Sequence, residues 1–559
     1  MLRLDGKDVG FEGDDTILDI CTRNNIRIPT LCHQEGLKPP ARCRICLVEM
    51  DGRLVTSCST KPHDGAVVET HSPRAVKGRK MNIELMMSGH ENPCNVMTDF
   101  KEMCGIFEDT GLESTRYPQL KDYKTDIGTS VVRDDNKCIN CGRCIDTCQQ
   151  IQEIYAIEFA SRGHNEHVAP YCDKDLADVA CIKCGQCIIN CPVGAITERE
   201  HLSEVLELLK DKKKDGRHIV VQTAPSIRVS LGEEFDMEPG TVVTGKMVAA
   251  LRRCGFDKVF DVDLGADMTI MEEATEFLKR LENGGPFPMI TTCCPGWILM
   301  MEHFYHELVA HMSTCRSPHE MLGILTKTYY AEKLGIPKDK IVVVSVMPCT
   351  AKKYESTRPE LDSSVDFVLT TRELGKLIRL KEIDFRNLHD EEFDPALGMA
   401  TGAGAIFGAS GGVMEAALRT AYKFGTGDDV TKLEFDQIRG MQGIKKGSML
   451  VGKREIRFAV AHGGANIRKL LEEREKYHFI EFMACPGGCI GGGGQPIPTT
   501  DAIRKQRMEG LYNADSHLTL RRSHDNPIVK KIYSEYLDKP GSKRAHRILH
   551  TRYFERSQF

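Results

Sequence analysis

Thr291-Thr-Cys-Cys-Pro-Gly-Trp297 is the first of three cysteine-bearing segments from which the fold of the second half of this chain is predicted. Two further cysteine-bearing segments, Met347-Pro-Cys349 and Met483-Ala-Cys-Pro-Gly-Gly-Cys489, lie far from it in the sequence. Each of the three ends a run that is typical of a buried strand. Because strand ends in an α/β layer converge on one crevice, the three segments are predicted to supply a single metal site.

Short, β-branched runs bounded by polar residues surround these segments. They cover residues 218–224, 258–263, 340–346 and 365–371. Helical patterns separate them, which predicts an α/β layer with largely parallel strands. One helix is predicted to begin at the capping-box pattern Thr269-Ile-Met-Glu272 and to end before Asn283-Gly-Gly-Pro286.

The composition limits the cellular setting. The chain has 559 residues, 23 cysteines and a net charge of -5. The small charge, with no long block of one sign, gives no support for nucleic-acid or anionic-membrane binding. The sequence shows no bilayer-spanning apolar run, signal-peptide core or twin-arginine pair, so a cytoplasmic location without membrane insertion is expected, unless a partner chain carries an export signal. Cysteines at two- and three-residue gaps favour metal ligation in a reducing compartment over disulfides.

The opening of the chain predicts a short hairpin, a helix near residues 16–25 and then four cysteines in loops. These cysteines are Cys32, Cys43, Cys46 and Cys58. Four thiolates in this spacing suit a 2Fe-2S cluster. Zinc is the alternative, but the C-x10-C-x2-C-x11-C spacing is not a usual zinc pattern.

Residues 138–191 contain two near-repeats of the bacterial two-cluster ferredoxin pattern. In that pattern the fourth cysteine of each repeat binds the other cluster. One 4Fe-4S cluster is therefore assigned to Cys138, Cys141, Cys144 and Cys191, and the second to Cys148, Cys181, Cys184 and Cys187. A pair of structural zinc sites is the alternative, which the Cys-Pro ending at residues 191–192 disfavours.

The three cysteine segments of the second half, with their flanks, resemble the signature loops of the FeFe hydrogenases. The matching residues are Thr291-Thr-Cys-Cys-Pro-Gly-Trp297, Met347-Pro-Cys-Thr-Ala-Lys352 and Glu481-Phe-Met-Ala-Cys-Pro-Gly-Gly-Cys-Ile-Gly-Gly-Gly-Gly-Gln-Pro496. The resemblance covers nearly the whole chain and implies a multidomain α+β and α/β fold. The implied parts are a β-grasp 2Fe-2S ferredoxin domain (1–77), a degenerate one-histidine three-cysteine segment (78–125), a two-4Fe-4S ferredoxin domain (126–208), a large α/β hydrogenase catalytic domain (209–500) and a small-subunit-like helical tail (501–559), which is expected to have no chemistry of its own.

The resemblance also implies the catalytic cofactor, the H-cluster. Its 4Fe-4S cubane is assigned to Cys294, Cys349, Cys485 and Cys489. The attached two-iron subsite carries carbonyl, cyanide and bridging dithiolate-amine ligands. The polypeptide cannot encode these ligands, so dedicated maturation proteins are implied as partners.

A proton path is implied next to the cubane. In the family it runs through a cysteine, an acid, a serine and a second acid, which are here Cys293, Glu273, Ser313 and Glu276. Glu273 and Glu276 lie one turn apart on a predicted helix, a pattern that by itself is more typical of a solvated helix face. Only the resemblance favours a catalytic role.

Several other residues are assigned to the catalytic pocket by their place in the motifs. Lys352 corresponds to the family lysine that donates to a cyanide, whereas a lone lysine is usually solvated. Met347, Met483, Pro225 and Phe407 are expected as pocket walls, with plain core packing as the alternative. The glycine run 491–494 is expected to let the backbone approach the cluster. Phosphate binding is the rival interpretation, but no Gly-Lys-Ser/Thr ending follows.

The segment His90-Glu-Asn-Pro-Cys94 resembles the start of a family motif that binds a further 4Fe-4S cluster through one histidine and three cysteines. This chain departs from the motif, because Met97 and Met103 stand at the expected cysteine positions and Cys104 comes one residue late. His90, Cys94 and Cys104 remain as candidate ligands. A thioether is a weaker ligand than a thiolate, so the segment is expected to hold a labile cluster or none.

The activity implied is the reversible reduction of protons to dihydrogen, with electrons relayed from or to a low-potential ferredoxin. An alternative is the catalytic subunit of an NADH-linked electron-bifurcating complex, in which flavoprotein subunits supply the flavin and nicotinamide sites that this sequence lacks. A hydrogen sensor or an iron-sulfur assembly relative is a further alternative. The complete proton path disfavours it, because a non-catalytic relative has little need of one.

Overall fold

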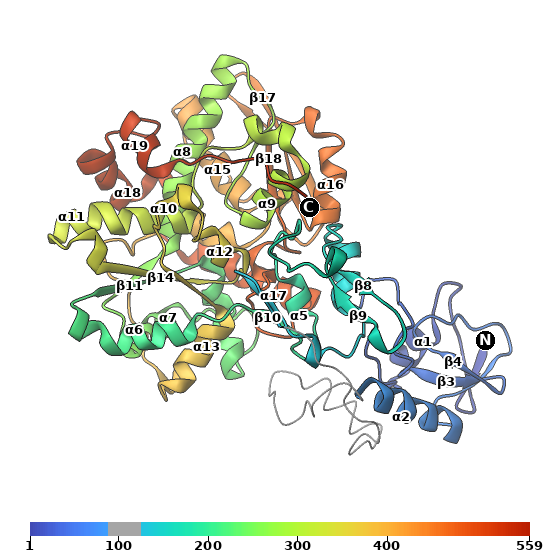
Figure 1. Ribbon diagram of the computed structural model, residues 1–559. Coiled ribbons are helices and arrows are strands. Elements are labelled where there is room, and N and C mark those ends of the chain that lie inside the picture. The colour runs from blue at the N-terminus through green and yellow to red at the C-terminus, as the bar shows by residue number, and fades with distance from the viewer. Residues whose placement is uncertain (88–124, 559) are drawn as a thin grey trace. The chain divides into compact units, whose positions relative to one another are not determined.

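The computed structural model describes residues 1–87 and 125–558, which form two compact units (Figure 1). The first comprises Met1–Gly128, Val132–Val179 and Asn190–Thr197, and the second Thr129–Val131, Ala180–Ile189 and Glu198–Phe559. The predicted catalytic domain and tail therefore fall within the second unit. Segment 180–189, with three predicted cluster ligands, also belongs to that unit. Within the described ranges, no helix has the length and apolar character needed to cross a membrane.

The first unit opens with the predicted hairpin and helix. Strands β1 (Leu2–Leu4) and β2 (Lys7–Val9) pair antiparallel, and α1 (Ile17–Arg23) follows. The helix starts there because Thr16 and Asp19 form a reciprocal capping box. Strands β3 (Leu47–Met50), β4 (Arg53–Thr56) and β5 (Val67–Glu69) complete a five-stranded sheet in the order β2-β1-β5-β3-β4, and α2 (Pro73–Met87) follows it.

The rest of the first unit is built from short elements around the cysteine-rich loops. They are β6 (Asp126–Ile127), β7 (Val131–Arg133), α4 (Arg143–Asp146), β8 (Glu158–Ala160) and β9 (His167–Ala169). The amide of Gln34 donates to the carbonyl of Arg143 at 2.9 Å, and the Arg42 guanidinium lies 3.6 Å from the Phe159 ring centroid. The 2Fe-2S-type and ferredoxin-type regions therefore pack directly against each other.

The second unit contains two four-stranded sheets. In the first, β12 (Lys258–Asp261), β11 (His218–Thr223), β14 (Ile341–Met347) and β15 (Phe367–Thr370) are all parallel, which confirms the predicted strands. In the second, β13 (Met289–Ile290), β18 (Phe479–Met483) and β17 (Arg454–His462) are parallel, and β16 (Ile444–Val451) is antiparallel. The three cysteine segments follow strands of both sheets, which are two separate hydrogen-bonded ladders.

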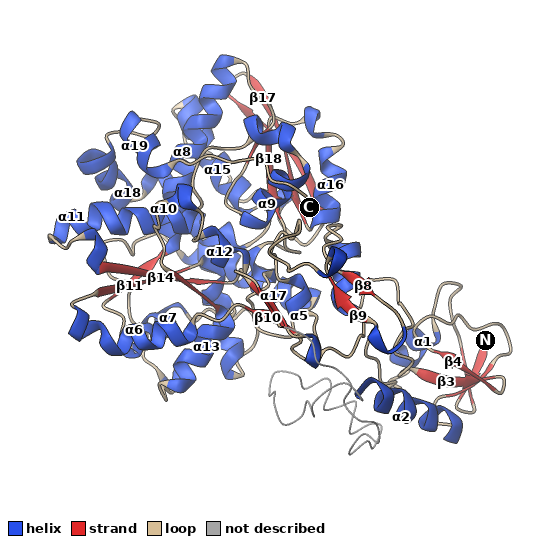
Figure 2. Cartoon of the chain, viewed as in Figure 1, coloured by secondary structure: helices blue, strands red, loops and turns tan. Residues whose placement is uncertain are grey.

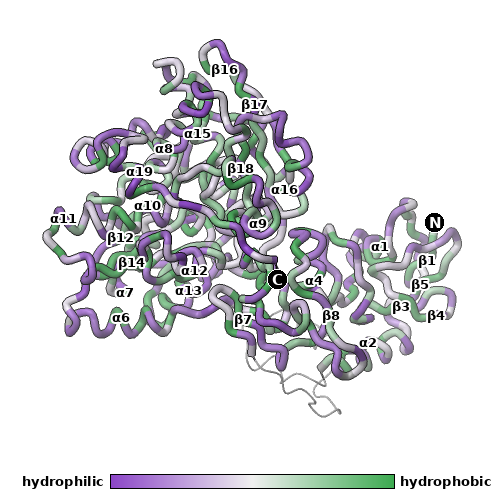
Figure 3. Tube along the Cα trace, turned by 45° about the horizontal axis from the view of Figure 1, so that its top comes forward, coloured by the Kyte–Doolittle hydropathy of each residue, from purple (hydrophilic) through white to green (hydrophobic). Residues whose placement is uncertain are grey.

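Helices cover both sheets of this unit. Figures 1 and 2 show α6, α7 and α13 on one side of the first sheet and α10 and α11 on the other. The strands themselves are largely apolar (Figure 3). The principal helices are α6 (Leu202–Asp215), α7 (Thr244–Cys254), α9 (Pro295–Phe304), α10 (Pro318–Leu325), α11 (Ala331–Leu334), α12 (Ala351–Glu355), α13 (Thr371–Leu380), α15 (Gly412–Thr426) and α16 (Gly464–Leu471).

Helix α8 (Val262–Asn283) begins earlier than predicted. Asp261 caps its first turn, whereas Thr269 lies inside the helix and donates to the carbonyl of Gly265 at 2.9 Å. The capping-box pattern at 269 is therefore not used, because the strong cap eight residues upstream starts the helix first. The predicted end is confirmed, since Gly284 adopts the left-handed conformation that terminates the helix.

The tail consists of α17 (Asp501–His517), α18 (Pro527–Ile532) and α19 (Lys543–Leu549). Buried ion pairs fasten it to the rest of the second unit. Arg507 lies 2.6 Å from Glu233, and Asp515 lies 3.0 Å from Arg419. Removing one partner of such a pair would destabilise the fold, because the remaining buried charge would be uncompensated.

Candidate active site

The three cysteine segments of the second half meet at one cavity of about 70 Å³. Strands β13 and β18 of one sheet and β14 of the other lead into these segments. The cavity therefore lies where strand ends of both sheets converge. Its lining includes every residue assigned to the cubane, every predicted wall, the predicted relay thiol and the lysine: Cys294, Cys349, Cys485, Cys489, Met347, Met483, Pro225, Phe407, Cys293 and Lys352.

Two of the cubane cysteines lie within two residues of the start of a helix. Burial raises the pKa of the Cys294 thiol, while backbone N–H groups at the start of α9 and that of Ala484 oppose the rise. The Ala484 N–H lies 3.3 Å from Cys294 Sγ. Burial likewise raises the pKa of Cys349 to about 12, against the N–H groups that begin α12. N–H groups directed at sulfur favour the thiolate form that iron requires.

The donor set fits an iron-sulfur cubane with further space beside it. Four cysteine sulfurs face a cavity whose other walls are mainly apolar and whose nearest cation is the buried Lys352 ammonium. Thiolate is the preferred ligand of iron-sulfur clusters. Without iron, four buried thiols here would be protonated, so the arrangement is suited to holding metal rather than to thiol chemistry.

The glycine run after Cys489 allows close backbone packing around the cavity, and Gly492 also lines it. A Cβ on Gly492 would clash with the carbonyl oxygen of Pro348, and one on Gly493 would lie 2.5 Å from Cys184 O. The glycines therefore let backbone segments pack on one another around the site. The predicted approach of these glycines to the cluster stays a prediction.

Lys352 is held by a buried cluster of charges at the cavity wall. Its ammonium lies 2.6 Å from Glu355 Oε2 and 3.2 Å from the carbonyl of Cys293. His319 Nε2 also lies 2.6 Å from Glu355 Oε2 and 3.0 Å from Glu320 Oε1. Burial alone would raise the pKa of Glu355, but Lys352 and His319 hold it at about 2. His319 could not be predicted as part of the site, because a single Pro-His-Glu at a helix start has no diagnostic spacing.

The residues of the predicted proton path lie near one another in the second unit. Burial raises the pKa of Glu273 to about 8, with the neighbouring Glu276 adding to the rise and Ser313 opposing it. Glu273 is close enough to Cys293 to raise the pKa of that thiol further. Ser313 Oγ lies 3.5 Å from Glu276 Oε2, and Glu276 forms a 2.6 Å ion pair with Arg280 near the surface. The four predicted residues thus lie in the expected order.

The first unit contains two separate cysteine clusters. Cys46 and Cys58 have their sulfurs 3.3 Å apart, and Cys32 and Cys43 are also in contact, all four being buried. This donor set fits a 2Fe-2S cluster. A second cavity, of about 20 Å³, is lined by all four predicted ligands of one 4Fe-4S cluster, Cys138, Cys141, Cys144 and Cys191.

The remaining ferredoxin cysteines Cys181, Cys184 and Cys187 belong to the second unit and lie against the catalytic loops. Thr350 donates to the carbonyl of Lys183 at 2.8 Å, and Gln186 donates to that of Gly491 at 2.8 Å. Cys485 Sγ lies 3.9 Å from Cys184 O. Cys148 belongs to the first unit, so its pairing with these three stays a prediction. The candidate ligands His90, Cys94 and Cys104 lie outside the described residues.

Known protein families match successive parts of the chain. The matching models are a 2Fe-2S iron-sulfur cluster binding domain (1–73), a 4Fe-4S dicluster domain (137–195), the iron only hydrogenase large subunit, C-terminal domain (217–493) and the iron hydrogenase small subunit (501–556). These ranges follow the order of regions expected from the motifs.

Individual relatives match over the full length. The NADP-reducing hydrogenase subunit HndD of Solidesulfovibrio fructosivorans is 46% identical, covering 100% of this chain and 99% of the relative. Iron hydrogenase 1 of Clostridium pasteurianum is 41% identical, covering 98% of this chain and 99% of the relative. A solved structure of a variant of apo [FeFe]-hydrogenase HydA1 from Chlamydomonas reinhardtii is 40% identical, with a TM-score of 0.58 over 64% of this chain and 100% of that chain. The chain therefore belongs to the family of iron-only, or FeFe, hydrogenases.

Proposed function

We propose that the reversible reduction of protons to dihydrogen takes place in the cavity between the three cysteine loops. This assignment rests on how two kinds of residue are distributed over the cavity wall. Four cysteines gather on it as cluster ligands, while the adjacent Cys293 faces a buried acid, Glu273. Electrons and protons therefore have separate entrances to one pocket.

Cys294, Cys349, Cys485 and Cys489 would hold the H-cluster. When bound, this cofactor supplies the redox chemistry by which dihydrogen is formed or split. The predicted walls Met347, Met483, Pro225 and Phe407 keep water out of the pocket, which strengthens electrostatic interactions inside it.

Cys293 holds a proton at Sγ on the cavity side and exchanges it with Glu273. A thiol suits this step better than an alcohol, because its pKa is nearer neutrality. The Glu273 carboxyl group is buried next to both Cys293 and Ser313, between which it can pass a proton in either direction. Ser313 then connects it with Glu276.

Lys352 orients the cofactor rather than exchanging protons. Glu355 and the Cys293 carbonyl hold its ammonium at the cavity wall. From there it can donate a charge-assisted hydrogen bond to an anionic ligand of the cofactor, such as cyanide. Such a hydrogen bond would help to hold the bound group in one orientation.

Electrons reach the pocket through the iron-sulfur clusters of the same chain. The loop of Cys181, Cys184 and Cys187 contacts the catalytic loops, which makes it the last relay before the cubane. A low-potential ferredoxin is the proposed electron partner, and hydrogenase maturation proteins are needed to install the two-iron subsite. In the His90 segment, Cys94 and Cys104 are the cysteines that remain to bind a further cluster.

A second candidate function is that of catalytic subunit in a nicotinamide-linked complex. It is favoured by the 46% identity, over the whole chain, to a subunit of an NADP-reducing hydrogenase. The chain has no flavin or nicotinamide motif, so NADH- or NADPH-oxidising flavoprotein subunits would have to supply those sites. A cytoplasmic location suits either set of partners.

Infrared spectroscopy tests the proposed function directly. The protein is produced together with hydrogenase maturation proteins, and spectra are recorded under argon and then under hydrogen. Carbonyl and cyanide bands that shift with hydrogen are expected. A protein that contains its iron-sulfur clusters but shows no such bands would contradict the proposal and favour an assembly-type role. Reduction assays with ferredoxin and with NADPH then separate the two partner sets.

A further inference from the structure

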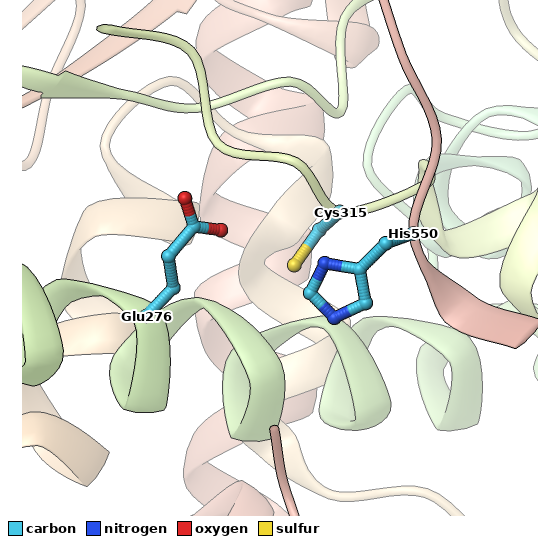
Figure 4. A group of neighbouring side chains, drawn as sticks. All are labelled: Glu276, Cys315 and His550. Carbon is cyan, nitrogen blue, oxygen red and sulfur yellow. The ribbon is translucent and has the colours of Figure 1, made fainter. Parts of the chain in front are cut away.

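The C-terminal tail reaches the outer end of the predicted proton path. His550, directly after α19, lies beside Glu276 of α8 and Cys315 (Figure 4). One side-chain donor atom from each of the three lies within 4.8 Å of the others. The tail therefore contributes a titratable group where a proton would leave the path.

Thr314 connects Glu276 with His550. Its hydroxyl oxygen lies 3.1 Å from Glu276 Oε2 and 2.7 Å from His550 Nδ1. A hydroxyl group has one hydrogen and two lone pairs, so it can donate to only one of these neighbours while accepting from the other. If Glu276 carries the proton, it donates to Thr314 and Thr314 donates to His550. If His550 Nδ1 carries the proton, both hydrogen bonds point the other way.

The other nitrogen of His550 has a fixed partner. Glu272 accepts hydrogen bonds from the Tyr533 hydroxyl at 2.6 Å and from the Gly541 N–H at 2.9 Å, and its Oε2 lies 3.0 Å from His550 Nε2. Because the Glu272 carboxylate can only accept hydrogen bonds, His550 Nε2 must carry a hydrogen and donate it to Glu272. The proton that His550 gains or loses is therefore at Nδ1, which faces Thr314.

We propose that His550 is the proton-exchange group at the outer end of the path, connected to Glu276 through Thr314. In one direction the O–H bond of protonated Glu276 breaks, Thr314 Oγ1 accepts that proton, and the former hydroxyl hydrogen of Thr314 forms an N–H bond at His550 Nδ1. Glu276 ends as a carboxylate and His550 as an imidazolium. The reverse transfer delivers protons to the cavity. The inference rests on the proposed function and extends its proton path into the tail.

Charged and titratable groups surround His550 on several sides. From α8 it faces the carboxyl groups of Glu272 and Glu276, with Lys279 and Arg280 farther along the same helix; Cys315 and Tyr533 are the titratable groups on the other sides. His550 is 8% exposed, and its ring stacks on the exposed His546 at 4.4 Å between centroids. Solvent is therefore next to the group that would exchange with it.

The test compares His550→Gln, His550→Ala and Thr314→Val in the matured holoenzyme, with His546→Asn as the matched control. Glutamine retains an N–H donor toward Glu272, so the fold should be preserved. Hydrogen-dependent dye reduction is measured across pH, with and without added imidazole. Infrared bands and thermal midpoints are recorded in parallel to monitor the cofactor and the fold.

A loss of about tenfold is expected for each of the three variants, with imidazole restoring the rate of His550→Ala and His546→Asn remaining near wild type. In a Glu276→Gln background, His550→Gln should have no further effect, because both residues act in series. An equal loss in both backgrounds, or no rescue by imidazole in a folded variant with unchanged bands, would overturn the assignment. If the wild type itself lacked the bands, the proposed function would fail instead.

Discussion

The electron side and the proton side of the catalytic cavity are built in different ways. On the electron side, the backbone of the Cys181–Cys187 loop lies against the loops that hold the cubane cysteines, with hydrogen bonds of 2.8 Å at Lys183 and Gln186. On the proton side, single side chains from α8, the 313–315 loop and the tail form a row that ends at His550.

This difference follows from what each side must transfer. Electrons tunnel through packed protein, so close backbone contact is sufficient and glycines that allow it are the important residues. Protons move only between groups that can accept and donate them in succession. One inert side chain therefore interrupts the proton path, whereas the electron side should respond gradually to small changes in packing.

The largest effect is expected from Cys293→Ala. Turnover should fall by about 10²- to 10⁴-fold, because no other group next to the cubane can exchange a proton with Glu273. Cluster content and infrared bands should be unchanged. Cys254→Ala, which removes a buried thiol from α7, serves as the matched control and should retain activity. Near-wild-type rates for Cys293→Ala would refute the assigned proton path.

A severalfold effect is expected from Gly185→Ala on the electron side. Gly185 has a φ of +69°, and a Cβ there would lie 3.0 Å from Gly493 Cα, so the loop must move away from the cubane loop. Dye-linked hydrogen oxidation should slow, while hydrogen–deuterium exchange, which needs no external electrons, should continue. Gly163→Ala is the control, since Gly163 has a φ of +63° but no neighbour within 4 Å. Equal losses in both assays would show that the two sides are not separable.

The smallest effect is expected from Glu273→Gln, which should change how thermal stability depends on pH. The folded pKa of Glu273 is about 8, against 4.5 for the ordinary side chain. Between these values the unfolded state has lost its proton and the folded state retains it, so the folded state loses stability as pH rises. The variant should gain a few degrees in thermal midpoint over wild type near pH 8 and little near pH 5. A gain of equal size at both pH values, or a similar gain for the exposed Glu282→Gln, would contradict this explanation.

The cubane cysteines could be predicted because they occur in compact motifs at strand ends, and the structure places all four at one cavity. Lys352, Met347 and Met483 belong to the same motifs, whereas Pro225 and Phe407 were expected only from the family resemblance; all five line the cavity. His319 and His550 could not be found. Neither has a diagnostic spacing, and their partners Glu355 and Thr314 lie 36 and 236 residues away in sequence.

The start of α8 shows why local patterns were not always sufficient. The pattern at Thr269 is a valid capping box, but Asp261 follows β12 directly and caps the helix first. The division into two sheets was hidden for a similar reason. Buried parallel strands have the same apolar composition in either sheet, and only their hydrogen-bonded pairing distinguishes β14 from β18.

The family resemblance assigned the residues of the predicted inner proton path in this hydrogenase. The sequence by itself determined the cysteine spacing of the cluster sites and the order of the regions. These depend on short-range spacing, which the geometry of iron-sulfur clusters and helix turns imposes on neighbouring residues. Only the tertiary structure decided that strand ends of two sheets share the catalytic cavity, that Cys181–Cys187 lies with the catalytic unit, and that a histidine of the tail meets Glu276. These are contacts between distant segments, which arise from packing and have no local signal in the chain.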